Sequence, residues 1–456
     1  MENISSDEKF PEIALQKELL ENFEYKESGR RWYWPVVADG TPLDTAQKAE
    51  LLLSQKAELP FLVSGLLERT CNLQCTHCLY QKEKSSKDVS REAHLAETIE
   101  HMVHEMPHQQ MDESEEDFYP YGPSFMSCGR ILRPWHLDIF QKLREDRPDV
   151  ALGVIDNGTY TQLLSKWPEG FKFDWIDISL DGTEEHHNEQ RGSPLAYTQA
   201  IEGLKHAREI VKPRTEGGKV ASLFTLTKIN AEDIEQVADT LLSKNEDDIS
   251  LADEFNITTL SPTNETNTPL ETDVESFANA WEGLKKINEK YPPTQDEEGK
   301  ISRSIFLRVY RVEDMEKIAS VVGERKFMEA LSVDESNPEK STVRVVRNNI
   351  EFDVDGIHVV YLPLSIWTPE ELLIEADGAY RTAYEGKYTL DELRSGHSKD
   401  GNDTAPYTIE KLSLETDFKK AYEHGVDHWW ENFGNKKLDQ EMETFQRIRE
   451  KAKEYG

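Results

Sequence analysis

Three of the four cysteines of this chain, Cys71, Cys75 and Cys78, lie within eight residues in a C-x3-C-x2-C spacing. A disulfide framework spreads its cysteines across the fold, whereas a tight group of cysteines indicates a metal site in a reducing compartment. Thiolates are the ligands of iron–sulfur clusters. Three thiolates on one short loop hold three corners of a four-iron cluster and leave one iron open to a small chelating molecule. The spacing therefore predicts a [4Fe–4S] site in a cytoplasmic protein.

A structural zinc site is the alternative that these residues leave open, because three cysteines with His77 or Cys128 make a tetrahedral set of ligands. His77 lies inside the cysteine motif, where it would strain to reach the same metal. An expected strand also precedes the loop, and small zinc modules do not need one. The cluster is therefore the favoured interpretation.

Around the cysteine loop, strand-like and helix-like segments alternate. Expected strands cover residues 61–67, 124–126, 151–155, 175–180, 220–226 and 256–260, and expected helices cover residues 94–106, 135–143, 195–209 and 231–242. This alternation predicts a parallel sheet with crossover helices. Six such units predict a partial (β/α)6 barrel similar to a TIM barrel, in which the chemistry lies on loops at the strand C-termini.

We expect three regions along the chain. Residues 1–56 form an N-terminal extension, residues 57–270 form the partial barrel, and residues 271–456 form a C-terminal α+β module. The module is expected to begin with an amphipathic helix over residues 271–291, followed by a β-rich stretch.

The charge of the chain is strongly negative, with 88 acidic and 53 basic residues and a formal net charge of −35. Such a surface repels phosphate backbones, so we expect no nucleic-acid partner. No apolar run reaches the ~18–20 residues that a membrane span needs. The first residues also lack the basic and apolar regions of a secretory signal. We therefore expect neither a membrane partner nor secretion.

The cysteine segment, with its Cys-Asn-Leu opening and its His-Cys ending, resembles the signature of the radical S-adenosylmethionine (SAM) superfamily. The resemblance covers about residues 58–265. It implies that the amino and carboxylate groups of SAM chelate the open iron. One electron from the cluster would then split SAM into methionine and a 5′-deoxyadenosyl radical, which abstracts a hydrogen atom from the substrate. A flavodoxin- or ferredoxin-type protein is the implied electron donor.

Further positions resemble SAM contacts of that superfamily. Residues 178–182, followed by Arg191, resemble its fourth-strand signature, which implies Ser179, Asp181 and Arg191 as SAM contacts. An arginine fork suits a carboxylate such as that of the methionyl group. A strand serine and a surface arginine are also common without any ligand, so a structural role stays open.

Two other turns carry weaker likenesses. Asn157 resembles the third-strand turn of the superfamily, with Asp156 in place of the usual threonine. Asn230 resembles a recurrent polar position after the fifth strand. Turn chemistry alone also explains an Asn-Gly pair.

The loop after the second expected strand departs from the superfamily, whose members usually carry Gly-Gly-Glu-Pro there. The corresponding positions are Ser127, Cys128 and Gly129, with Gly129 in place of the glutamate. Backbone carbonyls at Ser127 and Gly129 remain as acceptors for the SAM amino group, and Asp156 is a replacement carboxylate. Three roles stay open for Cys128: a small packing residue, a cluster ligand, or a hydrogen-atom donor, which is the role of a lone cysteine in radical SAM epimerases.

Residues 352–356 and 388–393 resemble the SPASM/twitch extension of the superfamily, but no cysteine follows Cys128, which excludes an auxiliary cluster. The predicted function is a radical SAM enzyme acting on a peptide or protein side chain. Two alternatives remain besides zinc. One is a radical SAM epimerase or dehydratase acting on a small-molecule, sugar-type natural product. The other is a related scaffold that has lost catalysis and binds a partner.

Overall fold

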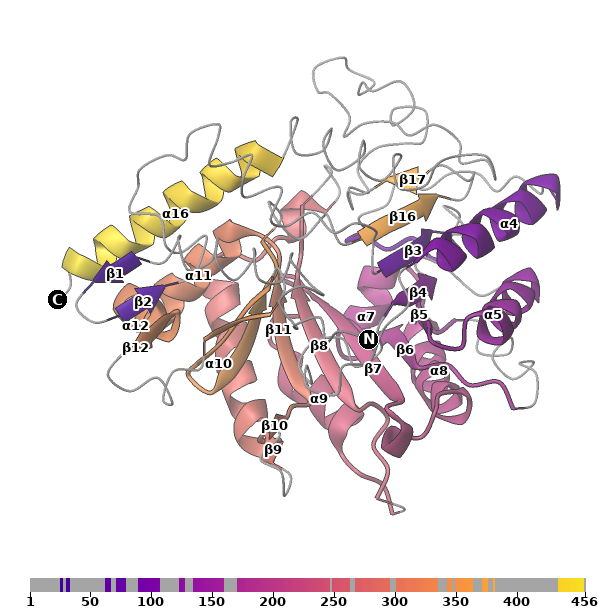
Figure 1. Ribbon diagram of the computed structural model, residues 1–456. Coiled ribbons are helices and arrows are strands. Elements are labelled where there is room, and N and C mark those ends of the chain that lie inside the picture. Colours follow the sequence, from indigo (N-terminus) through magenta and orange to yellow (C-terminus); the bar gives the residue numbers. More distant parts are fainter. Residues whose placement is uncertain are drawn as a thin grey trace, which may run out of the picture.

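The structure is a computed structural model in which residues 25–27, 30–32, 62–66, 71–78, 89–106, 123–127, 134–159, 170–246, 248–262, 267–295, 301–334, 343–346, 349–363, 371–375, 380–381 and 434–454 are described. Its centre is a large sheet with helices along one side (Figure 1).

Six strands of this sheet lie side by side in chain order and pair in parallel. They are β3 (Leu62–Leu66), β4 (Ser124–Ser127), β5 (Ala151–Asp156), β6 (Trp175–Ser179), β7 (Lys219–Leu226) and β8 (Glu254–Thr259). The helices that follow four of them are α4 (Val89–Glu105), α5 (Pro134–Asp146), α8 (Ala196–Ile210) and α9 (Ile234–Leu242). The expected partial barrel of alternating strands and helices is therefore confirmed.

The sheet continues beyond these strands at both edges. Past β8 it adds β11 (Ile305–Val309) and β15 (Ile357–Tyr361) in parallel, then β14 (Asn349–Val354) and β13 (Arg344–Val346) in antiparallel pairing. Past β3 it adds β16 (Glu371–Glu375) in parallel and then β17 (Tyr380–Arg381). Residues from the expected C-terminal module thus extend the sheet of the expected barrel, and the three-region division stays a prediction.

The outer face of the sheet is apolar because alternate strand residues point toward the helices. On β6, Ile176 and Ile178 are fully buried, and Phe224 of β7 and Phe255 of β8 meet at right angles in the same layer. This alternation places Asp177 and Ser179 of β6 on the opposite, inner face. The core between sheet and helices holds the fold together, and the inner face is left for polar groups.

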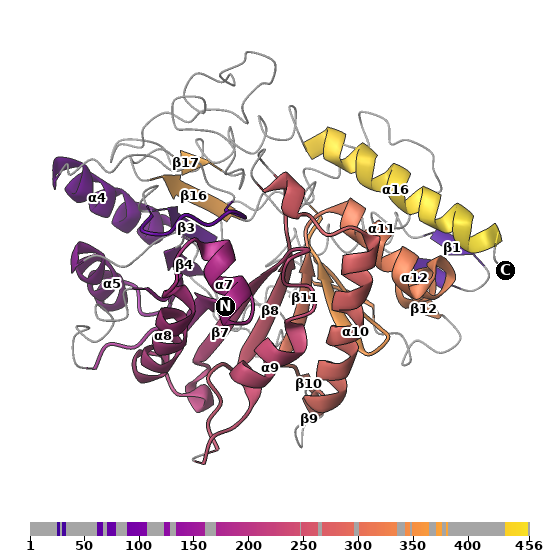
Figure 2. The ribbon, with the colours of Figure 1, turned by 180° about the vertical axis from the view of Figure 1, so that it is seen from behind.

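Further helices cover the C-terminal strands, as the reverse view shows (Figure 2). They are α10 (Val274–Lys290), α11 (Val312–Val322), α12 (Glu324–Ala330) and α16 (Asn435–Glu454). In the expected N-terminal extension, β1 (Tyr25–Glu27) and β2 (Arg30–Trp32) form a small antiparallel sheet with β12 (Ser332–Asp334). A segment of the expected N-terminal extension therefore pairs with a strand of the expected C-terminal module.

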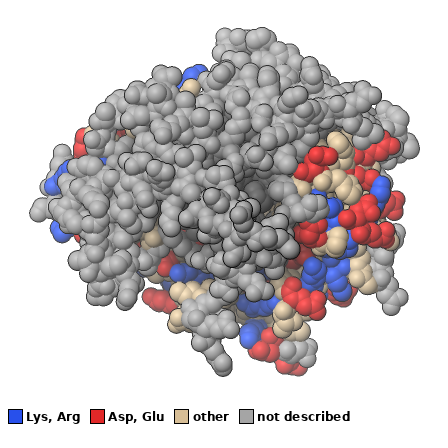
Figure 3. Space-filling view, viewed as in Figure 1, with Lys and Arg blue, Asp and Glu red and all other residues tan. Residues whose placement is uncertain are grey.

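Where described residues reach the surface in Figure 3, acidic and basic side chains are interspersed. Lys142 of α5, for example, pairs with Glu100 of α4. Among the described helices, none has the length and apolar content of a membrane span.

Candidate functional site

The cysteine loop, residues 71–78, follows β3 at the edge of the sheet where the parallel strands end. The neighbouring strands end in predicted site residues: β4 in Ser127, β5 in Asp156 and β6 in Ser179. Ser127 and Asp156 are buried and Ser179 is partly exposed. Because carboxyl ends of parallel strands share one edge, the fold brings these positions to the side that carries the loop.

Each of the three cysteines of the loop has a thiol that is not part of a disulfide, and each is partly exposed. Cys71 Sγ accepts from the backbone N–H of Leu73 at 3.5 Å and from Asn157 Nδ2 at 3.7 Å. Arg191 Nη1 lies 3.9 Å from Cys75 Sγ. N–H groups directed at sulfur stabilise the thiolate form, which is the form that ligates iron. The donor set therefore suits thiolate ligands of a cluster.

Burial raises the pKa of the Cys75 thiol, Arg191 opposes the rise, and Cys78, Asp181 and Cys71 add to it. The charge effects show that the three thiols lie close enough to influence one another. Three neighbouring thiolates repel each other, so a bound metal would supply the positive charge that keeps all of them ionised.

A short helix, α7 (Glu184–Arg191), holds the cysteine loop through its last carbonyl groups. The N–H of Thr76 donates to the carbonyl of Gln190 at 2.9 Å, and the N–H of Gln74 donates to that of Arg191 at 3.3 Å. Gly192 ends the helix with a left-handed φ of 64°, and a Cβ there would lie 2.9 Å from the carbonyl oxygen of Gln74. The loop and the helix end therefore fit together only at close approach. We call this pair of backbone hydrogen bonds the loop clasp.

Asp181 and Arg191 form a buried ion pair next to the clasp. Arg191 Nε donates to Asp181 Oδ2 at 2.5 Å, and Asp181 Oδ1 accepts from the N–H of Thr225 at 2.9 Å. Burial opposes ionisation of Asp181, but Arg191, His77 and His187 with the Thr225 N–H outweigh it and hold the pKa of Asp181 below its usual range. Asp181 thus stays negative and Arg191 positive beside Cys75.

His77 is buried and faces Asp181, with Nε2 3.5 Å from Asp181 Oδ2. Within the described residues, no three His, Cys, Asp or Glu side chains are grouped so as to hold a metal ion. The imidazole of His77 is thus engaged with Asp181 in this structure.

Asn157 links the turn after β5 to the cysteine loop. Besides its contact with Cys71, its Nδ2 donates to Asn72 Oδ1 at 3.3 Å, and Asn72 Nδ2 donates to Thr159 Oγ1 at 2.8 Å. Asp156 Oδ1 accepts from the N–H of Gly158 at 2.7 Å. The Asp156 carboxylate therefore shapes the turn that presents Asn157.

Asn230 is fully buried and lies behind the site. Its Oδ1 accepts from the N–H of Thr227, and its Nδ2 donates to the carbonyls of Asp181 and Thr225. Both ends of this amide are thus occupied by the protein, as a brace of the loop after β6. Cys128 and Gly129 lie outside the described residues.

Sequence reasoning missed α7 and the loop clasp. A local signal for the helix exists, because Thr183 precedes it, two glutamates occupy its first turn and Gly192 follows it. The clasp itself has no local signal, since it joins residues more than 100 positions apart. Asn72 and Thr159 were missed for the same reason.

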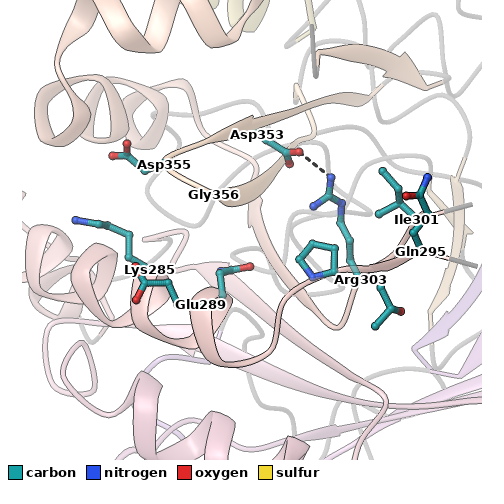
Figure 4. Close-up of a pocket in the computed structure, with 11 residues that line it drawn as sticks. Lys285, Glu289, Gln295, Ile301, Arg303, Asp353, Asp355 and Gly356 are labelled. Atoms are coloured by element: carbon teal, nitrogen blue, oxygen red, sulfur yellow. Dashed lines mark hydrogen bonds and ion pairs between the residues drawn. The ribbon is translucent and has the colours of Figure 1, made fainter. Parts of the chain in front are cut away.

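A hollow of about 430 Å³ lies away from the cysteine loop, between α10, the hairpin of β9 (Thr294–Gln295) and β10 (Ile301–Ser302), and the turn joining β14 to β15 (Figure 4). Arg303 Nη2 donates there to Asp353 Oδ2 at 2.7 Å. Lys326 pairs with Asp355, which also accepts from Trp281. The charges of Arg303, Asp353 and Asp355 are thus paired, and the described lining of the hollow holds no thiol.

No family model matches the chain. A curated relative is the Fe-coproporphyrin III synthase of Methanosarcina barkeri, 28% identical over 204 residues, which cover 42% of this chain and 43% of the relative. The chain thus matches less than half the length of that relative.

Solved structures with a similar arrangement include Streptococcus suis SuiB bound to its precursor peptide SuiA, with a TM-score of 0.48 and 11% identity over 85% of this chain and 70% of that one. Native anSMEcpe with bound AdoMet and a peptide has a TM-score of 0.46 and 14% identity over 81% of each chain. The HemN coproporphyrinogen III oxidase of Escherichia coli, described as a radical SAM enzyme, has a TM-score of 0.37 and 11% identity over 67% of this chain and 70% of that one.

Proposed function

We propose that this chain is a radical SAM enzyme whose cluster is held by Cys71, Cys75 and Cys78. The observation that carries the proposal is the cysteine loop itself, in which N–H groups are directed at two sulfurs and the loop clasp fixes the backbone at the strand C-termini. When bound, a [4Fe–4S] cluster with an open iron supplies the electron that cleaves SAM and starts hydrogen abstraction.

The residues around the loop have separate proposed tasks. Asn157 and the Leu73 N–H orient and stabilise the Cys71 sulfur. Ser179, partly exposed on the inner face at the end of β6, is the proposed SAM contact of that strand. The carbonyls at Ser127 and Gly129 are the proposed acceptors for the SAM amino group.

Anaerobic reconstitution with iron and sulfide tests the function. We expect about four irons per chain, a brown chromophore and, with SAM and a reductant, 5′-deoxyadenosine. A flavodoxin- or ferredoxin-type protein is the proposed donor in the cell. A chain that binds the cluster but never forms deoxyadenosine would instead be a scaffold that has lost catalysis. A chain that binds zinc and no cluster would contradict the proposal.

The proposed substrate is a peptide or protein side chain. The support is that residues 352–356, which resemble the SPASM/twitch extension, form the end of β14 and its turn and belong to the sheet that carries the site. A second candidate is a tetrapyrrole, favoured by the sequence match to the Fe-coproporphyrin III synthase. Porphyrin binding is visible as a change in the absorption near the Soret band. Incubation of the reconstituted protein with coproporphyrin and with a peptide mixture, each followed by mass spectrometry, separates the two classes.

Cys128 is the proposed hydrogen-atom donor that quenches the substrate radical. If it donates, Cys128→Ser should still form deoxyadenosine and fail to complete the product. Solvent deuterium should also enter the wild-type product, because thiol protons exchange with water. Normal product from Cys128→Ser without deuterium in the wild-type product would show a packing residue.

A further inference from the structure

Arg191 lies between a buried carboxylate and a sulfur of the cysteine loop. Its Nε bonds Asp181 Oδ2 at 2.5 Å, and its Nη1 lies 3.9 Å from Cys75 Sγ. The side chain of Asp181 is 0% exposed and that of Arg191 is 10% exposed. Two opposite charges thus lie beside one ligand sulfur where little water screens them, and charge interactions are strongest in such surroundings.

The same kind of pair occurs at the other end of β7, without a sulfur. Arg208 Nη1 donates to Asp253 Oδ2 at 2.5 Å. The same oxygen accepts from the backbone N–H of Val220, near the start of β7, at 2.9 Å. The remaining nitrogens of Arg208 face the carbonyl and hydroxyl of Ser250. An arginine–aspartate pair that braces β7 therefore needs no cluster ligand beside it, and the contact with Cys75 is a separate property of Arg191.

We infer that Arg191 and Asp181 set the reduction potential of the cluster, with opposite signs. The inference rests on the proposed function and assigns Arg191 to the cluster ligand rather than to SAM. The reduced cluster carries one more electron than the oxidised cluster. A positive charge beside Cys75 therefore favours reduction and a negative charge disfavours it. Arg191 raises the potential, while Asp181 lowers it and holds the guanidinium in place.

The test is a redox titration of the reconstituted full-length protein with sodium dithionite as the electron source, followed by electron paramagnetic resonance. Arg191→Met should lower the equilibrium constant for one-electron reduction about tenfold, which corresponds to ~59 mV. Asp181→Asn should raise it by a similar factor. Arg191→Lys keeps the charge and should stay closer to the wild-type potential than Arg191→Met.

Two sets of variants serve as controls. Arg208→Met and Asp253→Asn remove the matched charges at the other end of β7 and should leave the potential unchanged. The double variant Arg191→Met/Asp181→Asn leaves no single buried charge, so it should fold even where Arg191→Met does not. Its potential should lie between those of the two single variants.

Equal potentials in the wild type, Arg191→Met and Asp181→Asn, with four irons per chain in each, would overturn the inference and leave the proposed function standing. Weaker SAM binding by Arg191→Met at an unchanged potential would also overturn it, and would assign the guanidinium to SAM. A wild-type protein that takes up no cluster would instead contradict the proposed function, and the inference would fall with it.

Discussion

The two ends of the parallel sheet use buried charge differently. At the amino end, Asp174 accepts from Arg144, Lys212 and the N–H of Leu152, and all of these partners are structural. At the carboxyl end, the Arg191 guanidinium that pairs with Asp181 also reaches Cys75. The comparison teaches that ion pairing alone does not mark a functional site. The site is marked where a paired group also contacts a side chain that has chemistry to perform.

At the carboxyl end of the sheet, the largest effect is expected from removing a proposed cluster ligand. After reconstitution, Cys75→Ser should bind no more iron than the wild-type chain before reconstitution. It should form no deoxyadenosine, because one corner of the cluster loses its thiolate. Its free energy of unfolding without iron should stay near the wild-type value, since the thiol is partly exposed. Full SAM cleavage by this variant would refute the cluster assignment.

A substitution at the amino end of the sheet should instead affect stability and leave iron binding unchanged. Asp174→Asn should lower the free energy of unfolding by about 3 kcal/mol, because Arg144 and Lys212 lose their shared buried counter-charge. Denaturant unfolding gives the stability, and iron analysis of the folded fraction should still give the wild-type content. If Asp174→Asn kept its stability but lost iron, the charge at the amino end would serve the metal site and not the stability of the fold.

The two ends should also respond oppositely to pH through His187 and His358. Burial and Arg191 lower the pKa of His187 to about 3. The unfolded chain therefore binds this proton more readily, and stability falls by ~1.4 kcal/mol per pH unit below about pH 6.5. Burial opposes the charge of His358, but Asp353 and Glu351 outweigh it and raise its pKa. The protonated His358 therefore stabilises the fold fully at pH values below the ordinary histidine pKa. This contribution to the free energy of unfolding is lost as the pH rises through the raised pKa of the folded state.

Unfolding free energies measured between pH 5 and pH 9, on the order of one curve per pH unit, check these signs. His187→Gln should flatten the acid side of the profile, and His358→Gln should flatten the alkaline side. The same flattening on the same side in both variants would show that the two ends do not differ in this way.

The smallest expected effect concerns the loop clasp. Gly192→Ala should cost about 1–3 kcal/mol, because alanine is strained at φ 64° and its Cβ would press on the Gln74 carbonyl. Gly170→Ala is the matched control, since Gly170 also has a positive φ, of 88°, but has no neighbour within 4 Å. Differential scanning calorimetry should show the larger loss for Gly192→Ala, and only that variant should bind iron more weakly. Equal losses of stability in the two variants would show that the close approach of Gly192 to Gln74 does not stabilise the fold.

Much of the fold was predictable because it depends on local pattern. The strands after residue 150 agree with their expected ranges to within about two residues, because apolar runs end at turns such as Asn157-Gly158. The pairing of β16 with β3 and of β11 with β8 was not predictable, because a short apolar strand carries no mark of its partner.

The candidate site divides in the same way. The three cysteines are local and were predicted as a unit. Arg191 was predicted as a SAM contact from its place in a motif, but its distance to Cys75 depends on how α7 meets a loop 116 residues earlier in the chain. No pattern in either segment encodes that meeting.

That separation has a consequence for biosynthesis. The backbone partners of Gln74 and Thr76 are the carbonyls of Arg191 and Gln190, so the loop clasp cannot form until the ribosome has passed Gly192. At the usual ~5–20 residues per second of synthesis, the 116 residues from Cys75 to Arg191 take roughly 6–23 s. During that interval the three thiols are exposed on an incomplete sheet and open to oxidation. Delivery of the proposed cluster therefore belongs after α7 has been made and has packed against the loop, and not to the shorter nascent chain.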